Sequence, residues 1–475
     1  MFQFTSIEQY HAQLKEGNTT CKQAVQHFLK RIENLNHLNA FIEVFSDEAL
    51  TAAEQIDKKI KAGEALGKLH GVVIGLKDVL CYKNHQLSAC SNILNGFTSV
   101  YSATAVERLL AEDAIIIGRL NCDEFAMGSS NENSAYGNVL NAADETRVPG
   151  GSSGGSAVAV QAGLCMTSLG SDTGGSVRQP ADFCGIVGLK PTYGRISRYG
   201  LIAYASSFDQ IGIFGKNISD VALMLEIMAG PDEYDSTVSQ KEVPTYSSLL
   251  KTEKEKKYKF AYFKEALDHP AIDPEISKLI KSRILELEND GHTVKEVDLD
   301  LLDYIVPAYY VLTTAEASSN LSRYDGVRYG YRTQDKTRDL TEFYKETRSS
   351  GFGKEVKRRI MLGTFVLSAG YYEAYYTRAQ KVRKILTEKT LLIFKEFDFV
   401  ILPTSPMPAF RIGEKMTDPI AMYLADIYTV MANLTGCPAI SLPLFTHPNG
   451  LPTGLQLMSN RFDEVSLLRI SNQLL

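Results

Sequence analysis

The sequence lacks tryptophan, C-x-x-C cysteine pairs and any apolar run of the roughly 18 residues that a membrane span needs. Its seven cysteines are scattered, which argues against a disulfide scaffold or a zinc site and favours free, buried thiols in a reducing cytoplasm. The eight histidines show no paired-ligand spacing, so we expect no metal in this chain. The N-terminus has no signal-peptide pattern, and we expect a cytoplasmic protein without membrane contact.

Charge and composition are those of an ordinary globular protein. Of the 475 residues, 44% are hydrophobic and 22% are charged, which is enough to build a large core. The formal net charge of −6 gives no bulk electrostatic reason for tight binding to nucleic acid or to an anionic membrane. A nucleic-acid substrate delivered by a partner protein remains compatible with this charge.

Helical and strand-like segments alternate along the chain. Apolar runs predict strands at 114–118, 164–169, 259–262, 292–297 and 399–402. Capping patterns predict helices beginning at Thr104 (a capping box with Glu107), at Ser219 and at Asp273, and the small, apolar run 156–162 predicts a buried, tightly packed helix. This alternation favours an α/β fold, and we expect a single large domain over 1–475 with a central mixed β-sheet flanked by helices.

Two segments lie outside this alternation. Residues 239–257 are polar and rich in lysine and glutamate, which favours a surface connection. Residues 340–396 are mostly helical in pattern with many Arg, Lys and Tyr side chains. A solvated helical cap on the core is favoured there over a direct binding role.

Lys77 ends an apolar, β-branched run, His70–Asp78, that predicts a buried strand. A cation is costly to bury, and desolvation lowers the pKa of a lysine, so Lys77 could be a neutral amine able to take a proton. Taken alone, a lysine that reaches solvent from the strand end, or that pairs with Asp78, is the favoured interpretation.

Two glycine-rich runs carry serines, Pro149–Ser156 and Gly170–Ser176. Glycines allow backbone conformations and close approaches that present N–H groups to an anion, such as the oxyanion of acyl transfer. The first run formally fits the G-x-S-x-G elbow of α/β-hydrolases, but a polar segment precedes it and no suitable histidine follows. The second has phosphate-loop spacing, but Ser176 stands where that loop requires lysine. A serine activated by a lysine fits better than either.

These residues together resemble the amidase signature family. The match lies in 150–155, in 174–181 and in Lys77, and Ser176 follows Ser152 by the family's 24 residues. The resemblance implies the amidase signature fold with a signature core at about 65–215. It also implies a Ser–cis-Ser–Lys triad in which Ser176 is the nucleophile, Ser152 the bridging serine in a cis peptide and Lys77 the base. It assigns a supporting hydrogen bond to Ser153 and oxyanion-binding backbone N–H groups to Thr173, Gly174 and Gly175.

Three further stretches, 121–129, 316–326 and 351–359, are similar to one branch of that family. That branch forms the A subunit of bacterial glutamyl-tRNA(Gln)/aspartyl-tRNA(Asn) amidotransferases, over essentially the whole chain. The resemblance implies a glutaminase that supplies ammonia, working in a heterotrimer with a B and a C subunit. It implies that the B subunit uses ATP and Mg and contacts the aminoacyl-tRNA, while this chain needs no cofactor. The residues assigned to glutamine binding, under a helical cap at about 300–395, are Ser129, Tyr309, Arg359 and Asp426.

Two alternatives remain open on the sequence. One is a stand-alone amidase of the same family that acts on another small amide. It would have no use for an arginine and an aspartate that hold an α-carboxylate and an α-ammonium group. The other is an inert assembly scaffold that retains the fold.

Overall fold

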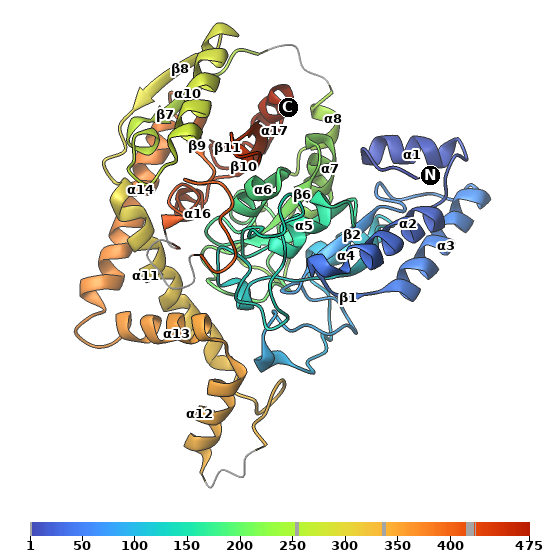
Figure 1. Ribbon diagram of the computed structural model, residues 1–475, viewed down its shortest axis with the longest axis horizontal. Coiled ribbons are helices and arrows are strands. Elements are labelled where there is room, and N and C mark those ends of the chain that lie inside the picture. Colours follow the sequence, from blue (N-terminus) through green and yellow to red (C-terminus); the bar gives the residue numbers. More distant parts are fainter. Residues whose placement is uncertain (1, 252–255, 335–338, 415–421, 423) are drawn as a thin grey trace.

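The computed structural model describes residues 2–251, 256–334, 339–414, 422 and 424–475. Within these ranges, eleven strands form one sheet that runs through the middle of an elongated molecule (Figure 1). The N-terminal helices lie at one end of the molecule, and the segment between about residues 259 and 300 lies at the other. The prediction of one large α/β domain with a mixed sheet is confirmed.

The strands follow the order β1-β3-β2-β4-β6-β5-β10-β11-β9-β7-β8 across the sheet. Parallel pairing joins β2 to β3 and β4, and β7 to β8 and β9, whereas the other neighbours pair antiparallel. The strand bounds are β1 Phe41–Val44, β2 Val73–Lys77, β3 Ile115–Leu120, β4 Thr167–Asp172, β5 Val187–Lys190, β6 Gln210–Gly215, β7 Lys259–Phe263, β8 Thr293–Val297, β9 Phe399–Pro403, β10 Ala439–Thr446 and β11 Pro452–Ser459.

Helices cover the sheet and extend beyond it. Figure 1 shows α12 projecting away from the body of the molecule, below α13. A π-helical turn, Glu373–Thr377, leads into α14. The helix bounds are α1 Ile7–Lys15, α2 Cys21–Asn34, α3 Ser46–Ala62, α4 Thr104–Ala111, α5 Gly154–Gln161, α6 Arg178–Cys184, α7 Ile218–Met228, α8 Tyr246–Leu249, α9 Lys264–Leu267, α10 Pro274–Asn289, α11 Leu302–Asn320, α12 Leu340–Gly351, α13 Lys354–Val366, α14 Arg378–Ile393, α16 Val430–Thr435 and α17 Glu464–Leu474.

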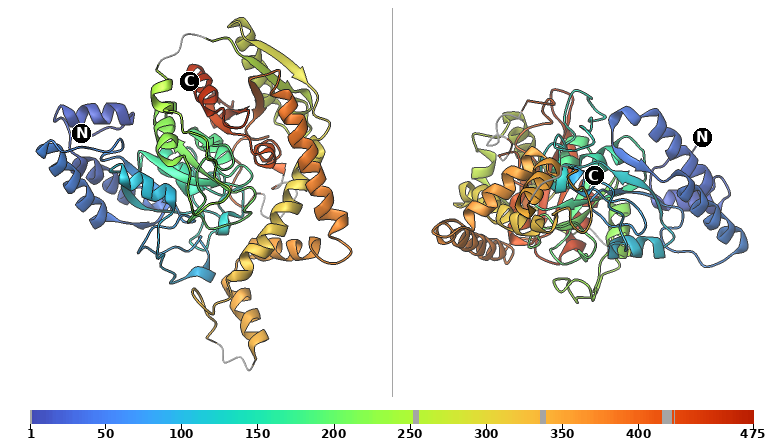
Figure 2. Two further views of the ribbon diagram at one scale, coloured as in Figure 1. Left: turned by 180° about the vertical axis from the view of Figure 1, so that it is seen from behind. Right: turned by 90° about the horizontal axis from the view of Figure 1, so that it is seen from below.

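Two hydrophobic cores lie on opposite sides of the sheet. Successive side chains of a strand point to opposite faces, and β9 follows this rule. Phe399 and Ile401 join the core that contains α7, α10 and α17, while Val400 and Leu402 join the core that contains α11, α14 and α16. The views in Figure 2 show the long α11 and α14 side by side along one flank of the molecule.

The pairing of β2 with β4 positions the chemistry. These strands are parallel, with Leu76 opposite Leu169, so their carboxyl ends lie at the same edge of the sheet. Lys77 is the last residue of β2 and Asp172 the last residue of β4. The loop that begins at Thr173 therefore starts beside the Lys77 side chain.

Some local predictions needed correction. Thr104 is the first residue of α4 and makes no capping box, because its hydroxyl donates to Asp232 Oδ2 (2.5 Å) instead. The side chain of Asn217, rather than Ser219, caps α7. β4 begins three residues later than predicted, because 164–166 still belong to the turn after α5.

The predictions for the polar connection and the cysteines agree more closely with the structure. Within the polar connection 239–257, α8 buries Tyr246, and 252–255 lie outside the described residues. All seven cysteines are free and buried, as predicted. Among the described residues, none of the helices combines the length and the apolar character that a membrane crossing requires.

Close packing of α13 on α11 depends on one glycine. A Cβ added to Gly363 would lie 1.9 Å from the carbonyl oxygen of Thr314, a distance at which backbone has to move. Gly363 follows Arg359 by one helical turn, on the same side of α13. The position of the predicted substrate-binding arginine therefore depends on this contact.

We predict that Gly363→Ala lowers the free energy of unfolding by about 1–3 kcal/mol, the usual range for overpacking. Urea unfolding followed by circular dichroism measures the change. Thr364→Ala, at the next and exposed position of the same helix, is the control and should leave the midpoint nearly unchanged. Equal midpoints for both variants would contradict the packing role of Gly363.

Candidate active site

The Lys77 amine is fully buried and surrounded by serine hydroxyls. Its Nζ lies 2.7 Å from Ser152 Oγ, 2.9 Å from Ser153 Oγ and 2.9 Å from Ser171 Oγ. Burial lowers the pKa of Lys77, and it outweighs the opposing effect of nearby acidic groups. The buried amine therefore gives up its proton more readily than a surface lysine does, and in its neutral form it can accept a proton from a hydroxyl.

Asp78 does not pair with Lys77. Its carboxylate instead forms an ion pair with Arg119 and accepts hydrogen bonds from the backbone N–H groups of Ser88 and Cys90. The lysine neither reaches solvent nor pairs with its neighbour, so both simpler interpretations of the strand-end lysine are wrong.

Ser152 and Ser153 come from the turn that leads into α5. The Gly151–Ser152 peptide bond is cis, as the family resemblance implies. A Cβ at Gly151 would lie 2.2 Å from Asp123 Oδ2, so only glycine fits before Ser152. Ser153 Oγ donates to the carbonyl of Ser171 and accepts from its N–H, which ties this turn to the end of β4.

Ser176 is the most accessible member of the predicted triad. It is 8% exposed, whereas Lys77 and Ser152 are 0% exposed. A nucleophile must reach its substrate while its base stays dry, and this order of burial fits those roles. Among the described residues no hydrogen bond joins Ser176 Oγ to Ser152, so that link belongs to the proposal below.

The backbone of the loop 173–176 presents N–H groups beside Ser176. Within the described chain, no acceptor lies in hydrogen-bonding range of the N–H groups of Thr173, Gly174 or Ser176. Gly175 departs from the prediction, because its N–H donates to Asp172 Oδ1 (2.8 Å). Three N–H groups, rather than those of the whole run, are therefore available to an oxyanion.

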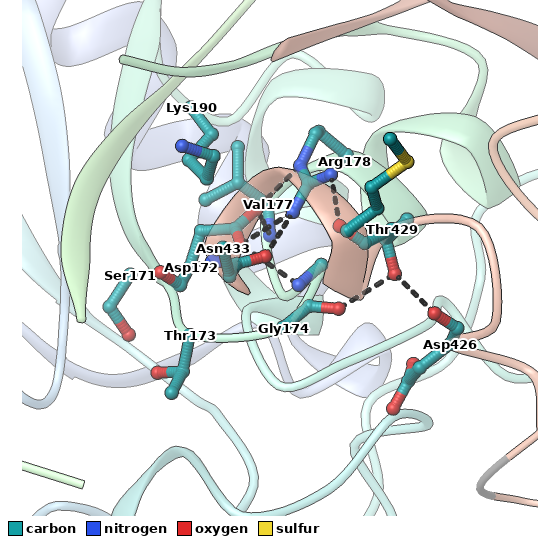
Figure 3. Close-up of polar contacts among 12 residues, drawn as sticks. Ser171, Asp172, Thr173, Gly174, Val177, Arg178, Lys190, Asp426, Thr429 and Asn433 are labelled. Carbon is teal, nitrogen blue, oxygen red and sulfur yellow. Dashed lines mark hydrogen bonds and ion pairs between the residues drawn. The ribbon is translucent and has the colours of Figure 1, made fainter. Parts of the chain in front are cut away.

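An ion pair between Asp172 and Arg178 holds this loop (Figure 3). Arg178 Nε and Nη2 donate to the two carboxylate oxygens at 3.0 and 2.9 Å, and Asn433 Nδ2 donates to Oδ1 at 2.9 Å. Although burial opposes ionisation, the arginine lowers the pKa of Asp172 to about 2. Asp172 stays charged and fixes the Gly175 and Val177 N–H groups.

Two glycines let other side chains approach the loop. A Cβ at Gly174 would lie 2.3 Å from the Tyr309 hydroxyl, and one at Gly175 would lie 2.2 Å from Thr429 Oγ1. Thr429 Oγ1 also donates to the Gly174 carbonyl at 2.7 Å, as Figure 3 shows. Tyr309, on α11, which is predicted to bind substrate, therefore lies directly against the loop 173–176.

Asp426 and Ser129 meet, although 297 residues separate them. Ser129 Oγ donates to Asp426 Oδ2 at 2.8 Å, and the Tyr310 hydroxyl donates to the same oxygen at 3.1 Å. Burial raises the pKa of Asp426 to about 7, and these hydrogen bonds and Arg359 oppose the rise. This carboxyl lies poised between its charged and neutral forms near neutral pH.

Arg359 is buried on α13, contrary to the surface position that a basic helix suggests. Its Nε donates to Glu355 Oε1 at 2.9 Å and its Nη1 donates to the Tyr204 hydroxyl at 2.8 Å. Its guanidinium carbon lies 5.4 Å from the ring centre of Tyr310, which also contacts Asp426. The structure thus brings a cation over the ring of Tyr310 and an acid to the hydroxyl of the same tyrosine.

Sequence reasoning missed several residues of this site. Ser171 lies inside the glycine-rich run and its neighbour Asp172 could have been considered there. Tyr310 lies next to Tyr309 in an apolar helix, so the sequence did not distinguish it from a core residue. No sequence pattern indicated a role for Tyr204. In the part of the chain that the structure describes, no group of three or more His, Cys, Asp or Glu side chains is arranged to hold a metal ion.

Comparison with known proteins gives long matches. The family model described as Amidase matches residues 23–468. A relative from Chlorobium phaeobacteroides (strain BS1), named as the A subunit of glutamyl-tRNA(Gln) amidotransferase, is 51% identical over 475 residues, covering 99% of this chain and 98% of the relative. The protein of the same name from Chlorobaculum tepidum is 51% identical over 476 residues, with the same coverage.

Solved structures share the fold along nearly the whole chain. The glutamyl-tRNA(Gln) amidotransferase A subunit from Thermotoga maritima is 38% identical with a TM-score of 0.77, covering 98% of this chain and 93% of that one. The peptide amidase of Stenotrophomonas maltophilia is 27% identical with a TM-score of 0.81, covering 99% and 96%. The fold is therefore common to several amidases, while sequence identity is higher to the amidotransferase A subunits. The chain belongs to the amidase family, among relatives named as the A subunit of glutamyl-tRNA(Gln) amidotransferase.

Proposed function

We propose that this chain is the glutamine-hydrolysing subunit of a tRNA-dependent amidotransferase and uses Lys77, Ser152 and Ser176 as its proton relay. The observation that carries the proposal is the buried Lys77 amine, 2.7 Å from Ser152 Oγ, at the sheet edge where the loop that contains Ser176 begins. The high identity to proteins named as amidotransferase A subunits supports the choice of glutamine over another small amide.

The reaction follows from the relay. Neutral Lys77 takes the proton of Ser152, Ser152 takes that of Ser176, and Ser176 Oγ attacks the carboxamide carbon of glutamine. The N–H groups of Thr173, Gly174 and Ser176 hold the oxyanion. The proton returns along the relay to the leaving nitrogen, which departs as ammonia and leaves a γ-glutamyl ester on Ser176. Water then hydrolyses this ester.

The α-substituents of glutamine fit the charged side chains of the site. We assign the α-carboxylate to Arg359 and the α-ammonium group to Asp426, with Tyr309 and Ser129 beside them. Charge-assisted hydrogen bonds of this kind are short and directional, so they fix which end of the substrate faces Ser176. Ser153 and Ser171 hold the Lys77 amine toward Ser152. The helices at about 300–395 cap the substrate side of a signature core at about 65–215.

The ammonia has to be used elsewhere, and the name of the relatives points to a multi-subunit enzyme. We propose a B subunit that activates the tRNA-bound carboxylate of Glu-tRNA(Gln) or Asp-tRNA(Asn) with ATP and Mg and contacts the tRNA, together with a C subunit. This chain itself then needs no cofactor. Because aminoacyl-tRNA is a substrate of translation, the proposal places the complex in the cytoplasm.

The complex reconstituted from this chain and its B and C subunits should hydrolyse glutamine faster than this chain alone.

Lys77→Ala should lower glutamine turnover about 10³-fold or more, nearly as much as Ser176→Ala, because triad members act as a unit. Ammonia release measures both effects, and circular dichroism checks that each variant is folded.

The exposed Lys83 offers a matched control, since Lys83→Ala removes a lysine close to the same strand without touching the site. Near-normal turnover of Lys77→Ala at pH 7 would refute the relay. Equal hydrolysis of glutamine and of propionamide by the wild type would favour a stand-alone amidase instead.

Arg359→Met should raise the KM for glutamine about 10- to 100-fold, because a hydrogen bond to a charged group contributes roughly 1.5–3 kcal/mol. Arg358→Met is the control: Arg358 lies next to it in α13 and also pairs with Glu355, but it is more exposed. Steady-state kinetics on both variants distinguishes them. An unchanged KM in Arg359→Met would remove the α-carboxylate assignment.

The KM for glutamine should rise as pH falls through about 7. The pKa of Asp426 is raised to about 7, so the carboxylate that accepts the α-ammonium group is present above this pH and is protonated below it. Kinetics on either side of pH 7 measures the change in KM. In Asp426→Asn the KM should be high and independent of pH, whereas a wild-type KM that stays constant would contradict the assignment.

A further inference from the structure

Two parts of the site are carried by separate elements. The loop 173–176, called the oxyanion loop below because it carries the proposed oxyanion-binding N–H groups, follows β4. Arg359 lies on α13, which packs on α11. A carboxamide reacts only if the distance between these parts matches the substrate, because a displacement of about 1 Å can lower a rate about 10²-fold. Asp209, which none of the roles above includes, lies between the two parts.

The position of Asp209 follows from strand register. β6 pairs antiparallel with β4, with Gln210 opposite Asp172. The residue before β6 is therefore a neighbour of the residue after β4, and Thr173 Oγ1 donates to Asp209 Oδ1 at 2.7 Å. The Asp209 side chain is buried, with 3% exposed, so water does not compete for this bond.

The same carboxylate holds the turn 204–209. The N–H of Tyr204 donates to Oδ2 at 3.0 Å, and the N–H of Ala205 lies 3.1 Å from Oδ1 and 3.0 Å from Oδ2. Phe208, inside this turn, packs edge to face on Tyr309 with ring centres 5.8 Å apart. One side chain thus fixes both Thr173 and the backbone of Tyr204.

The Tyr204 side chain completes the connection. Its hydroxyl accepts from Arg359 Nη1 at 2.8 Å and donates to Thr313 Oγ1 of α11 at 3.1 Å. The guanidinium carbon of Arg359 also lies 5.6 Å from the Tyr204 ring centre. A continuous path of hydrogen bonds and one rigid aromatic side chain therefore runs from the oxyanion loop through Asp209 to Arg359.

We propose that Asp209 is a positioning residue that sets the distance between the oxyanion N–H groups and the α-carboxylate site on Arg359. This inference rests on the proposed glutaminase function. The loop itself does not depend on Asp209 alone, because Asp172 and Arg178 hold Gly175 and Val177 independently. Loss of Asp209 should therefore impair substrates held at both ends and spare reagents that need only Ser176 and its loop.

The test compares two reactions of the reconstituted complex. Asp209→Ala removes both acceptor oxygens, so Thr173 and the Tyr204 turn both lose their bonds to this side chain. We expect kcat/KM for glutamine to fall at least about tenfold, while labelling of Ser176 by a small alkyl fluorophosphonate, followed by mass spectrometry, stays within about threefold of wild type. That reagent has no α-carboxylate and reacts through the same serine.

Thr173→Val is the second variant, which removes only the hydroxyl that reaches Asp209. In this variant too, kcat/KM for glutamine should fall while fluorophosphonate labelling of Ser176 stays near that of the wild type. Thr173→Ser should recover most of the lost glutamine activity. Asp220→Ala is a matched control. Asp220 is a buried aspartate that accepts a hydrogen bond from the Ile7 N–H, on the side of the other hydrophobic core. Its loss should change glutamine turnover and fluorophosphonate labelling to the same extent.

The outcomes are distinguishable. Equal loss of glutamine turnover and fluorophosphonate labelling in Asp209→Ala and Thr173→Val would assign Asp209 a merely structural role. Unchanged glutamine kinetics in both variants would overturn the positioning role while leaving the glutaminase proposal intact. A wild-type complex that is labelled at Ser176 but does not hydrolyse glutamine would overturn the proposed function and this inference with it.

Discussion

Burial of the Lys77 amine among hydroxyls, rather than against a carboxylate, governs the rest of the site. A cation without water or an ionised partner is unfavourable in a protein interior, so the enclosed amine loses its proton more readily than a surface lysine does. The enclosure is built from three chain segments: the end of β2, the turn into α5 and the end of β4. The amine is shielded from water only when all three segments are in position. Its burial therefore depends on the parallel pairing of β2 and β4.

The neighbouring carboxylate of Asp172, in contrast, is buried against an ionised partner. Asp172 is equally buried, yet Arg178 and Asn433 compensate its charge, and it keeps a pKa of about 2. Breaking such a buried pair usually destabilises a protein strongly, because it leaves one charge uncompensated. This fixed anion holds the Gly175 and Val177 N–H groups. The buried amine of Lys77 and the charged carboxylate of Asp172 thus lie at the ends of adjacent strands.

The helical side of the molecule joins this edge through contacts between distant segments. Both carboxylate oxygens of Glu124 accept the Gly353 N–H at the start of α13, which docks the helix of Arg359 onto the loop that carries Ser129. Glu316 on α11 accepts the N–H of Ser207 in the turn that Asp209 holds. Residues of the stretches 121–129, 316–326 and 351–359, which resemble one family branch, therefore take part in these contacts.

The sequence by itself determined the local parts: the apolar strand that ends at Lys77, the glycine-rich runs around Ser152 and Ser176, and the alternation of helices and strands that indicates an α/β sheet. These features depend on residue type and short-range spacing, so they can be recognised without a fold. The family resemblance added Asp426 and Arg359, and the basic helix of Arg359 by itself favoured a surface position for that residue.

Only the tertiary structure decided which groups meet. The Gly175 N–H is used by Asp172, Tyr310 links Asp426 to Arg359, and Asp209 connects Thr173 to Tyr204. Such contacts join residues from different strands and helices, and they follow from strand order, register and helix packing. These depend on the sum of many weak long-range contacts across the core, which no short stretch of sequence encodes.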